Sequence, residues 1–414
     1  AAAGARGGDY GAVVEPSARF DAVVLGLGGM GLAACRELAR RGARVLGLER
    51  HPLVHRLGSS HGGTRVVRLA YFEHADYVPL LRRSFEGFEA LEQETGERLL
   101  ERCGVAILGR QDSSLIAASA ESAATHGIPV EILEGDALRR RLPQFFAEAV
   151  EDPHRGILEP GAGFVRCERT LHALAAAARR DGAILRDRVE VGGWRARREG
   201  IEISYRQPEG EAVETLLADR LVIAAGPWSS SLLAPIGGPA FPVELVVTRQ
   251  VQGWIRPERP DLAIPTALPA WLVDRGEGRG PLYGVPVDPH ATPADPGHAM
   301  AKVALHGEGP PSDPDRVDRR VADAELVSLA SLAARHLPGL RGRIESASVC
   351  LYTNSPDGHF LIDHHPLDER VAIAAGFSGH GFKFAPVVGE ALADLAIEGR
   401  SGLPIGFLSL RRFG

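Results

Sequence analysis

An apolar run near the start of the chain leads straight into a glycine-rich turn and then into a helical pattern. Residues 23–25 form a short continuous apolar segment, which is typical of a buried strand, and residues 32–41 have helical spacing. A second strand is predicted over residues 44–48, directly before Glu49. Strand, turn, helix and strand in this order make a βαβ unit, which predicts a parallel sheet of the doubly wound type.

The rest of the chain alternates helical and strand-like patterns. Apolar residues at helical spacing, followed by glycine or proline, predict helices, and short apolar runs between turn residues predict strands. The predicted helices cover residues 77–95, 114–126, 135–142, 171–180, 322–336 and 386–397, and the predicted strands cover residues 104–109, 184–185, 188–191, 201–205, 213–218, 221–225, 344–353, 360–362 and 371–375.

Two stretches suggest antiparallel pairing. Residues 207–211 contain Pro-Glu-Gly between two predicted strands, which favours a hairpin turn. From Ala240 to His306, strand-like runs alternate with proline-rich loops rather than with helices. This second region is therefore predicted to be an antiparallel sheet, and we expect it to belong to a substrate domain.

Composition and charge narrow the class of protein. With 414 residues the chain is too long for one ordinary core, so two domains are expected. Hydrophobic residues are 44% and charged residues 24%, as in globular proteins. The net charge of −6 gives no basic surface, so nucleic acid is not expected as a partner. No apolar run reaches the ~18 to 20 residues that span a bilayer, so we expect no membrane association and a cytoplasmic protein.

Two further features of the sequence are expected to be structurally simple. Residues 1–18 are rich in alanine and glycine and are predicted to be a flexible leader. The four cysteines stand far apart, without a Cys-x-x-Cys pair, so neither a zinc site nor a disulfide framework is predicted, and no metal is expected.

The glycine-rich turn carries the first chemical signal. Gly26, Gly28 and Gly31 form Gly-x-Gly-x-x-Gly between a strand and a helix, where the backbone can approach a pyrophosphate. Glu49 stands near the spacing at which a carboxylate accepts hydrogen bonds from a ribose, and it argues against a 2′-phosphate, although Arg50 follows it. The turn predicts a dinucleotide site. A purely structural turn and an NAD-linked dehydrogenase are the alternatives.

Three further blocks follow in order along the chain: Ser59 to Arg68, Cys350 to Thr353 and Gly376 to Phe384. Together with the glycine motif they make the chain resemble the monomeric sarcosine oxidase family of amine oxidases, whose relatives include N-methyltryptophan and pipecolate oxidases. The resemblance covers about residues 20 to 410. It implies FAD as the cofactor, a secondary amino acid as the substrate and oxygen as the electron acceptor.

The expected fold class is α/β. A Rossmann-type FAD-binding domain with a parallel sheet is expected to be intertwined in sequence with an antiparallel-sheet substrate domain. The FAD-binding domain is assigned residues 19–90, 160–236 and 355–414, and the substrate domain residues 91–159 and 237–354.

The resemblance also implies which residues meet the flavin. Cys350 matches the cysteine that this family bonds covalently to the flavin ring through sulfur. From residue chemistry alone, a buried inert thiol is the better interpretation of that cysteine. The other cofactor-binding residues implied are Gly26, Gly28, Gly31, Glu49, Arg50, Thr64, Val189 on a strand, Gly226, Gly376, Gly379, His380, Gly381, Phe382 and Lys383.

Lys302 is one of very few lysines in the chain and stands in an otherwise apolar strand. A buried ammonium group needs a partner or a function. The residue matches the family lysine that promotes the reaction of reduced flavin with oxygen, and a positive charge there would stabilise developing anions. The alternative is a lysine at a strand edge that points to solvent. His306 should share its face of the strand, because side chains repeat every second residue, and it matches a substrate-pocket histidine.

The substrate carboxylate is expected at Arg68 and Lys383, which match the family's pair. A guanidinium fork and an ammonium point charge suit a carboxylate, and surface salt bridging is the alternative for either residue. Arg65 and His61 resemble groups near the flavin, although His61 could equally be a loop histidine that caps backbone groups. Tyr352 and Tyr283 resemble pocket tyrosines, and residues 287–297 look longer than in close relatives and could cover the pocket entrance.

These implications predict a monomeric, flavin-dependent oxidase. It would convert a secondary, N-methyl amino acid such as sarcosine to an imine, which hydrolyses, and would reduce oxygen to hydrogen peroxide. Lys302, Arg65 and His306 are assigned catalytic roles, and Arg68, Lys383, Tyr283, Tyr352 and His61 substrate-binding roles. The alternatives are an oxidase of a cyclic or bulkier amino acid of the pipecolate, proline or N-methyltryptophan type, an NAD-linked dehydrogenase, and a non-catalytic FAD-binding protein.

Overall fold

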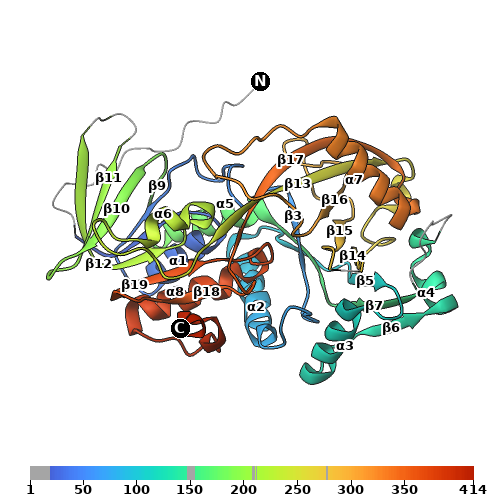
Figure 1. Ribbon diagram of the computed structural model, residues 1–414, viewed down its shortest axis with the longest axis horizontal. Helices are drawn as coiled ribbons and strands as arrows, with labels where there is room; N and C mark the ends of the chain where they lie inside the picture. The colour runs from blue at the N-terminus through green and yellow to red at the C-terminus, as the bar shows by residue number, and fades with distance from the viewer. Residues whose placement is uncertain (1–18, 147–153, 208–209, 211, 277) are drawn as a thin grey trace.

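Two large sheets and a small one organise the chain (Figure 1). The computed structural model describes residues 19–146, 154–207, 210, 212–276 and 278–414. The expected leader, residues 1–18, and most of the expected turn at residues 207–211 lie outside this description. The α/β class with one parallel and one antiparallel sheet is confirmed.

The first sheet has the strand order β10-β11-β12-β1-β2-β9, with β19 and β18 attached beside β12. Strands β9, β2, β1, β12 and β19 run parallel, while β10 and β11 extend one edge as an antiparallel ribbon. The strands are β1 (Arg19–Leu25), β2 (Val45–Leu48), β9 (Ile184–Arg186), β10 (Glu190–Ala196), β11 (Ile201–Arg206), β12 (Val213–Ile223), β18 (Leu361–His365) and β19 (Asp368–Ala375).

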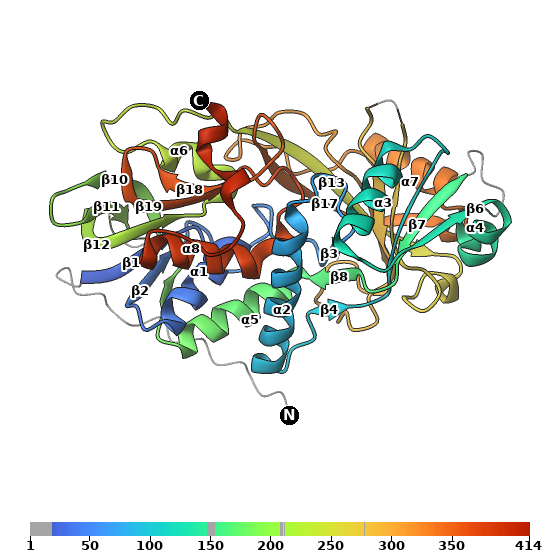
Figure 2. The ribbon, with the colours of Figure 1, turned by 90° about the horizontal axis from the view of Figure 1, so that it is seen from below.

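Four helices cover this sheet: α1 (Gly29–Arg40), α2 (Tyr77–Thr95), α5 (Cys167–Arg180) and α8 (Ala385–Glu398). Helix α1 packs between α5 and α8, and Figure 2 shows these three helices together beneath the strands. Their apolar faces form one core with β1, β12 and β19. Among the described residues, no helix is both long and apolar enough to cross a membrane.

Two strand predictions in this sheet were wrong. Residues 213–218 and 221–225 were expected to be separate strands, but β12 runs unbroken through Asp219, whose carboxylate pairs with Arg19 of β1. The strand expected over residues 188–191 instead begins at Glu190 and continues to Ala196. It continues through the two glycines because the register with β11 shifts between Val191 and Gly193, as at a β-bulge.

The second sheet has the order β17-β13-β16-β15-β14-β5-β7-β6 and is antiparallel except where β14 meets β5. Helices α3 (Ser114–His126), α4 (Gly135–Arg141) and α7 (Asp323–His336) accompany it. Its strands are β5 (Val105–Gly109), β6 (Glu131–Glu134), β7 (Arg155–Glu159), β13 (Val246–Pro257), β14 (Ala270–Val273), β15 (Leu282–Val285), β16 (Ala301–Leu305) and β17 (Gly342–Asn354).

A three-stranded sheet joins the two halves, with the order β3 (Thr64–Val67), β8 (Gly163–Arg166) and β4 (Leu100–Glu101). Strands β3, β4, β6, β7 and β8 were not predicted. Strand β6 shows why, since three of its four residues are exposed and no apolar alternation marks it.

The glycine-rich turn lies where β1 meets α1. Gly26 has φ +88°, and a Cβ atom on Gly31 would lie 1.7 Å from the carbonyl oxygen of Gly26. Glycine at both positions therefore lets the helix pack directly on the turn. Glu49 follows β2, and Gly226 follows β12, at the same edge of the sheet. The carboxyl ends of the parallel strands thus meet in one crevice, where doubly wound sheets bind ligands.

Candidate active site

A cavity of about 520 Å³ extends from this crevice to the second sheet. Most of the predicted site residues line it, from both halves of the chain. These are Gly26, Gly28, Glu49, Arg50, Arg65, Arg68, Val189, Gly226, Tyr283, His306, Tyr352, Gly376, Gly379, His380, Gly381, Phe382 and Lys383. Five other predicted site residues are not among those that line the cavity: Gly31, His61, Thr64, Lys302 and Cys350.

Glu49 is fixed at the nucleotide end of the cavity. Its carboxylate accepts hydrogen bonds from the backbone amides of Leu27, at 2.8 Å, and His51, at 2.9 Å. Burial acts to raise its pKa, but the His55 side chain and these two amides together lower it, so the carboxylate stays ionised. Val189 was expected on a strand. It lies instead between β9 and β10, and its amide donates to the carbonyl oxygen of Glu49 at 2.8 Å.

Arg50 is already paired. Its guanidinium donates to the carboxylate of Asp315 at 2.7 Å, and the same carboxylate oxygen accepts the indole N–H of Trp228 at 2.8 Å. The carboxylate of Asp315 therefore neutralises the positive charge of Arg50, which a 2′-phosphate would otherwise need as its partner. The bond also ties the segment before α7 to the nucleotide end of the cavity.

The register of the second sheet brings several predicted residues to one face. Lys302 on β16 pairs with Trp254 of β13, and Cys350 on β17 pairs with Gln250 of β13. Gln250 and Trp254 are an even number of residues apart and point to the same side of β13. Lys302 and Cys350 therefore share that face, as does Tyr352 two residues beyond Cys350.

Lys302 is held in a cradle of backbone carbonyls. Its ammonium group donates to the carbonyl oxygens of Gly62 and Thr64, both at 2.9 Å. The side chain is 2% exposed, so the solvent-facing alternative is wrong. Burial, followed by the charge of Arg65, lowers the pKa of Lys302 to about 7.

Glu168 shapes this cradle, although the sequence analysis did not single it out. Its two carboxylate oxygens accept the backbone amides of Gly62 at 2.8 Å and Gly63 at 2.9 Å. Both amides are thereby fixed, and the carbonyl of Gly62 is turned toward Lys302. Glu168 lies in the first turn of α5, where an acidic residue is commonplace, so position alone gave no signal.

His61, Arg65 and Cys350 lie beside this cradle. The Arg65 guanidinium donates to the Ser59 carbonyl at 3.0 Å and approaches the Cys350 sulfur at 3.5 Å. Both ring nitrogens of His61 are buried and lack a hydrogen-bond partner among the described residues, so this histidine does not cap backbone groups there. Burial lowers its pKa to about 3, which makes it a neutral imidazole.

Arg68 is buried at the far end of the cavity, and its partner is Glu73. The guanidinium donates to the Glu73 carboxylate at 2.7 Å and to the Ala70 carbonyl at 2.6 Å. Burial acts to raise the pKa of Glu73, but the charges of Arg68 and its neighbours hold it at about 2. Because Arg68 is only 3% exposed, the surface salt bridge considered for it is wrong.

Lys383 approaches the same end of the cavity from the other side. Its ammonium donates to the Tyr71 hydroxyl at 3.2 Å and to the backbone carbonyl of His380 at 2.9 Å. Burial lowers the pKa of Lys383 to about 7. It is 9% exposed and makes no ion pair within the described part of the chain, so the surface alternative fails here too.

Two aromatic side chains, Tyr352 and His306, also line the cavity. The Tyr352 hydroxyl lies 3.3 Å from Nδ1 of His306, whose pKa burial lowers to about 4. The ring of Tyr352 also rests on Gly379, where a Cβ atom would lie 2.2 Å from it. The absence of a side chain at Gly379 therefore makes room for a tyrosine ring of the chain itself.

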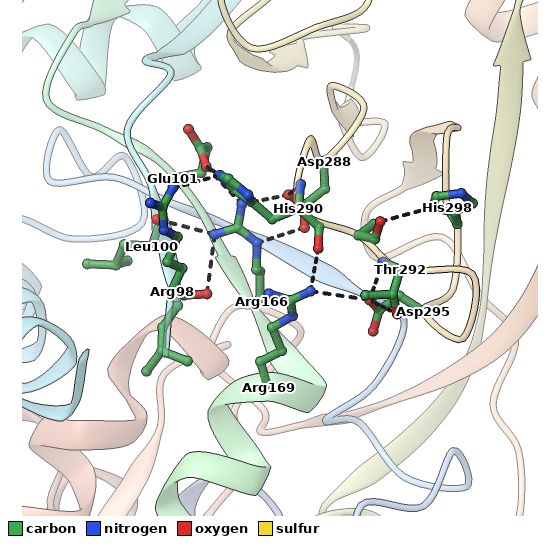
Figure 3. Close-up of polar contacts among 12 residues, drawn as sticks. Arg98, Leu100, Glu101, Arg166, Arg169, Asp288, His290, Thr292, Asp295 and His298 are labelled. Atoms are coloured by element: carbon green, nitrogen blue, oxygen red, sulfur yellow. Dashed lines mark hydrogen bonds and ion pairs between the residues drawn. The ribbon is translucent and has the colours of Figure 1, made fainter. Parts of the chain in front are cut away.

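The segment that looked long, residues 287–297, is held by polar contacts with arginines of β8 and α5 (Figure 3). Arg166 binds the Asp288 carboxylate with two bonds, at 2.7 and 2.5 Å, and Arg169 holds the His290 carbonyl. A Cβ atom on Gly63 would lie 3.1 Å from the Pro296 carbonyl, so the segment packs against the Lys302 cradle. None of its residues lines the cavity.

Comparisons with known proteins identify the family. The model of the family described as DAO, FAD dependent oxidoreductase, matches residues 21–395. The monomeric sarcosine oxidase of Streptomyces avermitilis is 40% identical over 96% of this chain and 98% of its own. The human peroxisomal sarcosine oxidase is 31% identical over 92% of both chains. A solved structure of NikD, an unusual amino acid oxidase essential for nikkomycin biosynthesis, is 26% identical, with a TM-score of 0.79 over 94% of this chain and 97% of that one.

The chain therefore belongs to the FAD dependent oxidoreductase family, among the relatives of monomeric sarcosine oxidase. It is an FAD-dependent amine oxidase. The cavity fits that cofactor, because one end has a glycine-rich turn, a helix N-terminus and the Glu49 carboxylate. Thr353 is also among the residues that line the cavity, and its buried hydroxyl has no hydrogen-bond partner among the described residues.

The two hydrogen bonds that Glu168 accepts from Gly62 and Gly63 should stabilise the fold. Glu168→Gln leaves one oxygen to accept two amides, so the free energy of unfolding should fall by about 1.5–3 kcal/mol, the range for hydrogen bonds to charged groups. Equilibrium unfolding in urea measures this change in the free energy of unfolding. The control is Glu121→Gln on the exposed face of α3, which should change stability by less than about 0.5 kcal/mol. Equal losses in both variants would contradict a role for Glu168 in holding the turn.

Proposed function

We propose that this enzyme oxidises a secondary, N-methyl amino acid such as sarcosine to an imine that water hydrolyses, and that it reduces oxygen to hydrogen peroxide. The observation that carries the proposal is a single cavity with a nucleotide-binding turn at one end and two buried cations, Arg68 and Lys383, at the other. FAD, when bound, supplies a hydride acceptor that oxygen can reoxidise.

Arg68 and Lys383 would bind the substrate carboxylate. The Arg68 guanidinium has N–H groups beyond the two that Ala70 and Glu73 take, and Lys383 has a third N–H beyond its two protein bonds. Glu73 balances the charge of Arg68, so Lys383 contributes the net positive charge that a carboxylate would neutralise. A substrate anchored there would have its amine near His306 and Tyr352.

The amine must lose its proton before a hydride can leave the neighbouring carbon. The positive charges of Lys383 and Arg65 disfavour an ammonium ion in the cavity and so lower the pKa of the bound amine. His306 is neutral above about pH 4 because its pKa is lowered by burial, so its imidazole can accept a hydrogen bond from that amine. Tyr352 would orient this imidazole through their shared hydrogen bond.

The same pocket also fits an oxidase of a cyclic or bulkier amino acid, such as pipecolate or proline. This alternative rests on the N-methyl-L-tryptophan oxidase of Salmonella arizonae, which is 30% identical over 95% of the chain. A dehydrogenase that depends on NAD is not supported, because the family model is that of FAD enzymes.

An anaerobic spectral titration tests the function. Sarcosine or another N-methyl amino acid should bleach the flavin absorbance, because the anchored carboxylate directs the amine carbon to the flavin. Pipecolate, proline and N-methyltryptophan distinguish the alternative substrate class. Dimethylamine, which has no carboxylate to anchor, should reduce the flavin far more slowly. A bound flavin that no amine reduces would show a non-catalytic FAD-binding protein.

We also propose a covalent bond between Cys350 and the flavin, in which a carbon–sulfur bond would replace the thiol S–H and a flavin C–H bond, and oxygen would take up the two electrons and two protons released. In support, the sulfur of Cys350 lies 3.5 Å from the guanidinium of Arg65, which lines the cavity. The next two residues along the strand, Leu351 and Tyr352, also line the cavity. Acid-precipitated protein should keep its yellow colour, and Cys350→Ala should release the flavin into the supernatant. Cys167→Ala is the matched control, since that buried thiol is also free, and it should retain the colour. Loss of colour from the unaltered protein would disprove the bond.

Lys302 is proposed to promote the reaction with oxygen. Lys302→Met removes a charge that would stabilise developing anions, so the rate of reoxidation should fall about 10²- to 10³-fold, while anaerobic flavin reduction should change much less. Stopped-flow absorbance measures the two half-reactions separately. Lys302→Arg restores the charge and should recover part of the oxidative rate. Equal slowing of both half-reactions by Lys302→Met would place this lysine elsewhere in the mechanism.

A further inference from the structure

Tyr71 touches both cations of the proposed carboxylate site. Its side chain is 1% exposed, and the Arg68 guanidinium lies over its ring, 4.4 Å from the centre. Its hydroxyl group lies 3.2 Å from the ammonium group of Lys383. Tyr71 is thus placed to fix the relation between the two cations.

The directions of the hydrogen bonds around Tyr71 follow from His380. Nε2 of His380 lies 3.1 Å from the Gly358 carbonyl oxygen, which can only accept, so Nε2 carries the proton. Burial lowers the pKa of His380 to about 3, so the ring is neutral and Nδ1 has a free lone pair. The Tyr71 hydroxyl, 2.7 Å from Nδ1, donates its hydrogen to that nitrogen, and Glu73 is the other acceptor beside it, so in either direction the hydrogen points away from Lys383.

Lys383 therefore meets only acceptors. The Tyr71 oxygen, having given its hydrogen to His380, presents lone pairs to the ammonium group, and the second partner is the His380 carbonyl at 2.9 Å. An ammonium group satisfies both acceptors with two N–H bonds and keeps a third for a substrate. The lone pair of a neutral amine would find no donor in either partner.

Two charged groups near Lys383 act on it in opposite directions, and the charge of Glu73 has the larger effect. Arg68 disfavours its charge and Glu73 favours it, and these two are paired with each other. His306 is neutral near pH 7, since burial lowers its pKa to about 4. The charge of Glu73 and the two hydrogen-bond acceptors of Lys383 together oppose the effect of its burial.

We infer that Tyr71, oriented by His380, is a positioning residue that keeps Lys383 protonated and so sets the pH range in which the site binds a carboxylate. This inference rests on the proposed function, in which Lys383 binds the substrate carboxylate. The charge on Lys383 is present below its pKa of about 7 and is lost above it. Tyr71→Phe removes one of the two acceptors, so the pKa should fall by about one unit or more, a tenfold change in the ionisation constant.

The sequence makes this pKa directly measurable, because Lys302 and Lys383 are the only lysines in the chain. Holoenzyme grown with ¹³C-labelled lysine should show two titrating lysine signals by NMR, and Lys302→Met assigns them. In Tyr71→Phe the Lys383 signal should titrate at lower pH, and the Lys302 signal should not move.

Tyr77→Phe is the matched control. It also removes a buried tyrosine hydroxyl, but one that lies 3.3 Å from Nδ1 of His359 and accepts the Phe360 amide at 3.2 Å. The Lys383 pKa should be unchanged in this variant. An unchanged pKa in Tyr71→Phe, or equal shifts in both variants, would overturn the inference. If Tyr71→Phe does not fold, His380→Phe removes the acceptor that orients the hydroxyl and should also lower the pKa, and no shift there would overturn it.

Substrate binding provides a second readout. The KM of a carboxylate substrate should rise at high pH in Tyr71→Phe and converge with that of the unaltered enzyme at low pH, where Lys383 is protonated in both. A KM raised equally at every pH would indicate a structural defect and contradict the inference. If no amino acid reduces the flavin, the proposed function fails, whereas the lysine titration still decides whether Tyr71 controls Lys383.

Discussion

The burial of two ammonium groups is the constraint on which the site depends. Of 47 lysine and arginine residues, only Lys302 and Lys383 are lysines, and both are buried beside one cavity. An unpaired buried charge is costly, so each must be met by fixed acceptors. The carbonyls of Gly62 and Thr64 meet one, and the His380 carbonyl and the Tyr71 hydroxyl meet the other. These acceptors belong to turns that Glu168 and the Tyr71–His380 bond hold in place.

Lysine and arginine are not interchangeable under this constraint. An arginine stays charged wherever it is placed, and the buried Arg68 is accordingly paired with the half-buried carboxylate of Glu73, whose pKa is about 2. A buried lysine can have its pKa moved by its surroundings, and both lysines here have values near 7. The site thus combines Arg68, whose charge Glu73 neutralises, with two lysines whose charge depends on their surroundings.

Local signals in the sequence predicted the parts of the site that are local in space. The glycine turn and Glu49 lie in one βαβ unit, so their spacing alone placed them together. The partners of Lys383 could not be found in this way, because Tyr71 and His380 are 309 residues apart and the strands between them leave many arrangements open. Arg68 and Glu73 are close in sequence, but no periodic pattern distinguishes an ion pair buried in a cavity wall from one on a surface.

The pattern of apolar residues around Lys302 does not decide whether its side chain is buried or exposed to solvent. A lysine in an apolar strand fits a solvent-facing edge as well as a buried site, and the choice depends on whether the strand has neighbours on both sides. Strand β16 lies between β13 and β15, so its backbone has no free edge and the side chain points to a covered face. Twelve paired positions join β13 to β17, and a slip of one residue would turn Cys350 and Tyr352 away from that face. The long β13–β17 pairing therefore fixes which side chains of the second sheet share the face that carries Lys302.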